Sequence, residues 1–219
     1  PQMISRAHAA LLPSPALIET RREIYRFATG SQALSDDLLD SPLIRNVLRS
    51  VIMDERRLRD IDIEHAETVA RGSARLQWGS HELDVLAAPD SDHALRAVLD
   101  TLGEQQTSFR TAADSAFTAN LRALQEGAEL ACHTVPDVVD DLAPHVGLVG
   151  ILRPVDGHLA VHSASPRLFP GMILLGDPST PIEAAEMLLH EAAHARYFDT
   201  IIVHDLLPPD ADDVERFAP

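Results

Sequence analysis

The stretch GMILLGDPSTPIEAAEMLLHEAAH, residues 171–194, decides the fold that we expect for this chain. It opens with a short apolar run that is typical of a buried strand and that stops at Gly176. Thr180 then fits a helix N-cap, Pro181 fits the first helical position, and Glu183 completes a capping box. The sequence therefore predicts a strand, a tight turn and a helix that continues to about residue 200.

The end of this stretch is the pattern H-E-x-x-H, formed by His190, Glu191 and His194. Side chains four positions apart lie on the same face of a helix, so both imidazoles are able to grip one metal ion. A glutamate beside the first histidine is able to reach a water bound to that metal. A core helix with two hydrogen-bonded histidines is the alternative, but burying two imidazoles and a carboxylate is costly without a metal. We predict His190 and His194 as metal ligands and Glu191 as the catalytic group.

A third metal ligand is needed, because zinc enzymes use three protein ligands and iron oxygenases use two histidines and a carboxylate. If the helix continues, Asp199 lies on a different face from the two histidines. If the chain folds back after residues 201–203, His204 or Asp205 reaches the site, and we favour these two. The acidic residues of the tail read instead as a solvated loop: Asp210, Asp212, Asp213 and Glu215.

Outside this stretch, apolar periodicity predicts helices first and a small sheet afterwards. The expected helices cover residues 14–29, 42–52, 61–70, 91–102 and 108–130, and residues 79–88 fit either a strand or a connector. Beyond Pro144 the pattern changes to expected strands at residues 146–152, 158–162 and 171–175. This order predicts an α+β protein, with a helical region over 1–140 and a metal-site region over 141–219.

Composition limits the function classes. The 219 residues are 45% hydrophobic, enough for one good core. The net charge is −16 and every basic residue is arginine, which argues against a nucleic-acid surface. No apolar run is long enough to span a membrane and no signal peptide is visible, while a single cysteine, Cys132, fits a reducing cytoplasm. We therefore expect a cytoplasmic protein whose oligomeric state stays open. We expect the chain to be either a piece of a longer protein or a protein with processed ends.

A strand, a tight turn and an HExxH helix together resemble the zincin arrangement of metallopeptidases. In that arrangement the strand before the helix often lines the cleft and pairs with an extended peptide. The resemblance implies that Met172, Ile173 and Leu174 form a substrate-binding edge strand, with an ordinary sheet strand as the alternative. The longer metzincin pattern is absent, because Tyr197 and Thr200 occupy the positions where it needs glycine and histidine.

A closer resemblance is to the bacterial HExxH-motif peptide-modification proteins, which are associated with ribosomally made peptide natural products. It rests on Phe169–Leu175, Glu183–Leu189 and His190–Arg196. The resemblance implies an iron(II)- and 2-oxoglutarate-dependent peptide β-hydroxylase that acts on a precursor peptide, with iron held by His190 and His194. Arg153, Arg167 and Arg196 are then candidates for pairing with 2-oxoglutarate.

Two other functions stay open. A zinc metallopeptidase would use the same pair of histidines, because imidazole suits zinc and iron alike. A non-catalytic peptide-binding domain with a vestigial metal site would explain an incomplete set of ligands. Members of the resembling family continue well beyond the motif helix, whereas this chain ends 25 residues after His194.

Overall fold

The computed structural model describes residues 12–29, 34–54, 74–87, 98–100, 107–154 and 162–206. Its helices are α2 (Ser14–Thr29), α3 (Asp36–Asp40), α4 (Pro42–Asp54), α7 (Phe117–Thr134), α8 (Pro136–Leu142) and α9 (Pro181–Leu206), with a short 3-10 helix η1 (Ala143–His145). Its strands are β1 (Ala74–Trp78), β2 (His81–Val85), β3 (Thr107–Phe109), β4 (Leu148–Pro154), β5 (Ser163–Ala164) and β6 (Met172–Gly176). The protein therefore mixes helices with a sheet, as the α+β prediction requires.

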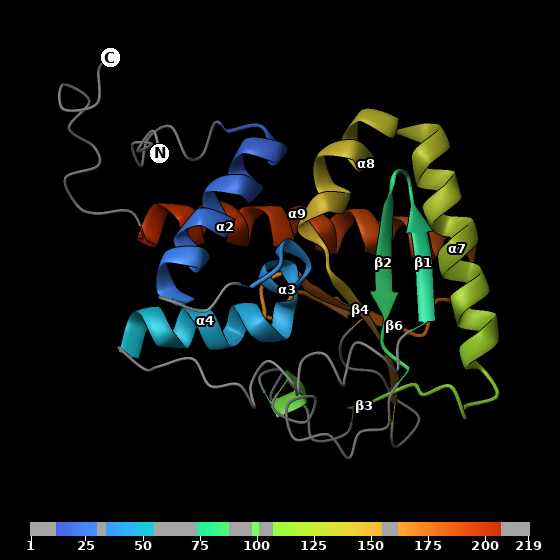
Figure 1. Cartoon of the computed structure of the whole chain (residues 1–219). Helices are drawn as coiled ribbons and strands as arrows, with labels where there is room; N and C mark the ends of the chain where they lie inside the picture. Colours follow the sequence, from blue (N-terminus) through green and yellow to red (C-terminus); the bar gives the residue numbers. More distant parts are fainter. Residues whose placement is uncertain are drawn as a thin grey trace.

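The strands form a mixed sheet in the order β1-β2-β4-β6-β5, with β3 paired to β4. Its centre is parallel, because β4 runs parallel to both β2 and β6. The other pairs are antiparallel, and the β1–β2 pair is a hairpin closed by Gly79 and Ser80. Figure 1 shows α9 running lengthwise across the molecule, with α2 and α4 near one end and α7 and α8 near the other.

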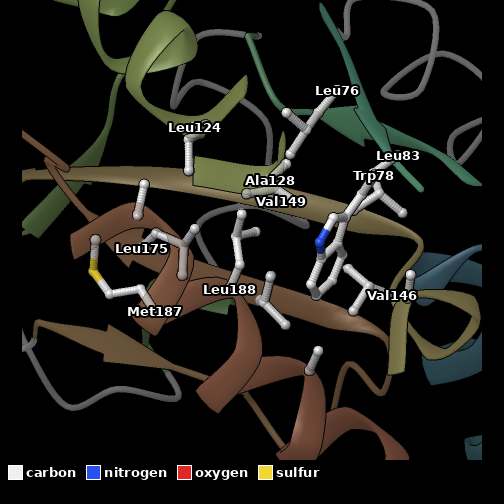
Figure 2. Close-up of a cluster of buried hydrophobic side chains, with 14 of the residues drawn as sticks. Leu76, Trp78, Leu83, Leu124, Ala128, Val146, Val149, Leu175, Met187 and Leu188 are labelled. Carbon is white, nitrogen blue, oxygen red and sulfur yellow. The ribbon is translucent and has the colours of Figure 1, made fainter. Parts of the chain in front are cut away.

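The sheet is covered on both faces, and the central strands divide their side chains between two cores. Val149 and Ile173 pack into the core made with α7, α8 and α9, part of which is shown in Figure 2. Leu148 and Leu174 belong to the core made with α3 and α4. Since both faces are buried, β4 and β6 read as continuous apolar runs rather than as alternating ones.

Several predicted elements are confirmed: α2 and α4 begin at the expected residues, and β4 and β6 are the two expected buried strands. The ambiguous segment at residues 79–88 contains a strand, β2. The predicted helix over 108–130 is wrong in its first part, because β3 pairs with β4 and α7 begins only at Phe117. The elements predicted over 61–70 and 158–161, and most of 91–102, lie outside the described residues.

The boundary that we predicted near residue 140, between a helical region and a metal-site region, divides the strands of a single sheet. The hairpin of β1 and β2 lies within the region that we expected to be helical, and β2 pairs with β4 beyond the boundary. Helix α7 also packs along α9, and Gly127 permits this contact because a Cβ there would lie 2.6 Å from that of Ala184. The two expected regions therefore share one sheet and both of its cores.

Candidate metal site

The start of α9 fixes the helix that carries the motif. The Glu183 backbone N–H donates to Thr180 Oγ1 at 3.3 Å, and the Glu183 carboxylate accepts from the Ser179 backbone N–H at 3.0 Å. Hydrogen bonds from the Ser179 backbone N–H and hydroxyl to the carboxylate lower the pKa of Glu183. The charge of Glu183 lies in the first turn of α9, at the positive end of the helix dipole. The predicted capping box is confirmed, and the Ser179 backbone N–H also donates to the carboxylate.

His190 and His194 lie one turn apart on α9, and their rings converge. Their Nε2 atoms are 3.2 Å apart and the ring planes meet at 74°. Two nitrogens about 3.2 Å apart and each ~2.1 Å from one metal ion subtend about 100° at it, between the octahedral and tetrahedral angles. The side chain of His190 is 63% exposed, so the pair opens to solvent. This donor pair fits two neighbouring coordination positions of zinc or iron(II).

Glu191 points toward the sheet instead of toward solvent. Its side chain is only 3% exposed, and Ser165, directly after β5, donates its hydroxyl to Glu191 Oε2 at 2.6 Å. The same hydroxyl lies 3.0 Å from the Glu191 carbonyl oxygen. Glu191 Oε1 remains 3.8 Å from His190 Nε2. Ser165 fixes one oxygen of this carboxylate, and the other oxygen lies beside the two imidazoles. Glu191 is therefore oriented to bind a metal held there or to accept a proton from a water bound to it.

His204 and Asp205 do not join this pair. The expected turn after residues 201–203 is absent, because α9 continues to Leu206. Ten residues of helix separate His194 from His204, which is about 15 Å along the axis. Among the described residues no group of three His, Cys, Asp or Glu side chains is placed to hold a metal. The acidic residues of the tail lie outside the described part of the chain.

Asp199 has a different role from metal binding. It is fully buried and accepts hydrogen bonds from Arg21, Arg45 and, at 2.7 Å, from Nδ1 of His145. Burial by itself would raise the pKa of Asp199, but the charges of Arg21 and Arg45 outweigh it and lower the pKa far below its ordinary range. Asp199 is therefore the anion that joins α9 to α2, α4 and η1.

The strand that precedes α9 is not the edge of the sheet. Met172, Ile173 and Leu174 belong to β6, which pairs with β4 along its whole length and with β5 at Leu174. All three residues are buried. The predicted substrate-binding edge at Met172–Leu174 is therefore wrong, and β5 at Ser163–Ala164 occupies that end of the sheet order.

The three arginines considered for 2-oxoglutarate have separate surroundings. Arg196 is engaged elsewhere, because its Nε donates to Asp141 Oδ2 at 2.8 Å. Arg153 Nη1 lies 3.8 Å from Asp114 Oδ1. Arg167 is exposed, two residues after the Ser165 that holds Glu191. Position therefore favours Arg167 among the three.

Comparison with protein-family models, with curated proteins and with solved structures gives no match for this chain. Among the described residues no helix is both long and apolar enough to cross a membrane. Sequence reasoning identified the three motif residues but missed Ser165, whose contact with Glu191 spans 26 positions and has no local signal.

Proposed function

We propose that this chain is a metal-dependent enzyme that modifies peptides, and that its reaction is iron(II)- and 2-oxoglutarate-dependent hydroxylation. The observation that carries the proposal is the convergence of His190 Nε2 and His194 Nε2 at 3.2 Å, beside the fixed carboxylate of Glu191. The resemblance of residues 169–196 to peptide-tailoring proteins favours hydroxylation over other metal-dependent reactions.

The chain's own residues have distinct roles in this proposal. His190 and His194 hold the metal, which supplies oxygen activation when it is bound. Glu191 either completes the two-histidine, one-carboxylate set after a change of side-chain torsion, or orients the site from its present position. Ser165 acts as a positioning residue through its hydrogen bond to Glu191. Arg167 is the candidate partner for the distal carboxylate of 2-oxoglutarate.

The substrate in this proposal is an extended peptide. Strand β5 ends the sheet order directly before Ser165, so a peptide that pairs with Ser163 and Ala164 would run past Glu191. With backbone pairing of this kind, the strand register, and not the identity of the peptide's side chains, determines which peptide residue lies at the metal site. Such binding suits an enzyme that acts on a precursor peptide.

An assay of product formation with controlled oxygen tests this proposal. The protein is reconstituted with iron(II) without oxygen, and 2-oxoglutarate, oxygen and a candidate precursor peptide are then added. One oxygen molecule should convert one 2-oxoglutarate to succinate and carbon dioxide while the second oxygen atom enters a C–H bond of the peptide. Succinate and a peptide heavier by one oxygen atom are expected from wild type and not from His194→Ala. No succinate above the level of His194→Ala would contradict hydroxylation.

A zinc metallopeptidase is the second candidate, and the hydrogen bond that fixes Glu191 favours it. The carboxylate lies 3.8 Å from His190 Nε2, close enough to accept a proton from a water bound beside the two histidines. In that reaction Glu191 accepts the proton of the attacking water. Chelator-sensitive cleavage that Glu191→Gln abolishes, with zinc still bound, would support it, and an intact peptide with zinc-loaded wild type would exclude it. A protein that binds metal and peptide without turnover in either assay would be the non-catalytic binding domain, which the incomplete ligand set among the described residues favours.

A further inference from the structure

The two motif histidines lie on the outer face of α9. The side chain of His190 is 63% exposed, and His194 is exposed as well. Ala193 lies between them in the sequence, is exposed on the same face, and has only a methyl group as its side chain. A second protein surface is therefore able to approach both imidazoles closely.

This pair supplies only two of the donors that a zinc ion takes. Among the described residues no third His, Cys, Asp or Glu side chain is placed to complete a set. A zinc ion that is held by protein ligands alone is tetrahedral, with four donors. At zinc–nitrogen distances of ~2.1 Å the edge of that tetrahedron is about 3.4 Å, close to the 3.2 Å between the two Nε2 atoms. The pair therefore fits one edge, and a second pair of the same spacing fits the opposite edge.

A second copy of the chain offers that second pair. Two opposite edges of a tetrahedron are related by a two-fold axis, and two-fold symmetry is the commonest symmetry of protein dimers. The same two nitrogens of another copy would then fill the empty edge. Ala193 of each copy lies at this contact, where its small side chain leaves room for the partner helix.

Charge indicates that the metal, and not the surrounding protein surface, would hold the two copies together. Each chain has a net charge of −16, so two copies repel each other. The exposed neighbours of the pair on this face of α9 are acidic or uncharged, namely Glu186 and Tyr197. A divalent cation at the contact offsets part of the repulsion and supplies the attraction. The association is therefore expected only when the metal is present.

We propose that a zinc ion binds between two copies of this chain, held by His190 and His194 of each, and that this dimer is a closed state of the metal site. Four imidazoles fill the tetrahedral coordination of zinc, so no position is left for a water or a substrate. Zinc thereby regulates the site by withdrawing both copies from turnover. The inference rests on the metal pair of the proposed function, but not on either reaction.

Sedimentation velocity of the full chain at increasing zinc concentration tests the shared site. The metal-free protein should sediment as a monomer of 23.9 kDa, and about half an ion of zinc per chain should double that mass. Zinc in excess should restore the monomer, because each pair then holds its own ion at one per chain. A mass that stays constant while zinc binds at one ion per chain would overturn this inference alone. Absence of zinc binding would contradict the proposed metal pair as well.

Variants locate the contact. Ala193→Arg keeps both histidines but places a long charged side chain between the copies, so zinc should still bind at one ion per chain without any increase in mass. Ala119→Arg makes the same change at an exposed alanine of α7 and should dimerise like wild type. The double variant of His190→Ala and His194→Ala should stay monomeric at every zinc concentration. Zinc-dependent doubling of the mass in Ala193→Arg or in the double variant would refute the proposal.

Discussion

Replacing Asp199 by Asn should destabilise the protein more than changing any exposed carboxylate. The substitution keeps the shape of the side chain and removes one negative charge at a fully buried position. Arg21 would retain only its share of Asp40, and Arg45 would have no anionic partner among the described residues. Breaking a buried ion pair by removing one partner costs about 3–5 kcal/mol.

Urea denaturation followed by circular dichroism measures this effect. With a slope of about 2 kcal/mol per molar urea, a loss of about 4 kcal/mol lowers the unfolding midpoint by roughly 2 M. Asp140→Asn, at an exposed position on α8, is the matched control and should change stability by less than about 0.5 kcal/mol. Equal midpoints for Asp199→Asn and wild type would refute the buried cluster. Folded Asp199→Asn should have the same affinity for added zinc or iron(II) as wild type, which would separate this structural role from that of a ligand.

Further predictions concern acid, capping and packing. Burial lowers the pKa of His145 against the opposing effect of Asp199, so the unfolded chain binds this proton more readily. The free energy of unfolding should therefore fall as the pH drops below about 6.5. In urea denaturation at roughly pH 5 to 7, the range in which imidazole titrates, His145→Gln should make the free energy of unfolding less dependent on pH. An unchanged pH dependence in His145→Gln would contradict this role of His145. Thr180→Ala should cost about 0.5–2 kcal/mol by removing the N-cap of α9, measured by thermal unfolding against Thr118→Ala. Gly127→Ala should cost about 1–3 kcal/mol, because its Cβ would lie 2.6 Å from that of Ala184; wild-type stability would contradict this close packing.

The parts of the fold that local sequence encodes were predictable. The start of α9 was predicted because Thr180 and Glu183 satisfy backbone groups within one turn of helix, and Pro181 fits the first helical position, where no N–H is needed. Strand β6 was predicted because both of its faces are buried and all its residues are therefore apolar or glycine. The β1–β2 hairpin had a readable signal that was overlooked, namely Gly79-Ser80 between runs that alternate Leu76, Trp78 and Leu83, Val85.

Other features depend on contacts between distant parts of the chain. The three residues of β3 are too few to show a periodicity, so the helical pattern of α7 was extended back over them, although they pair with β4. Asp199 meets partners 54, 154 and 178 positions away, so the sequence around it cannot show that it is buried. The third-ligand prediction was wrong for the same reason: α9 continues to Leu206, where Val203 packs with Leu17 of α2 and Ile202 belongs to the core made with α4.

Metal binding by the pair on α9 is the measurement that tests the central claim most directly. Titration of the metal-free protein with zinc or iron(II), the latter without oxygen, should give one site per chain. His190→Ala and His194→Ala should each weaken that site by more than about tenfold, or 1.4 kcal/mol. His133→Ala, which removes an exposed histidine from α7, should leave it unchanged. Wild-type affinity in the double variant of His190 and His194 would contradict the account.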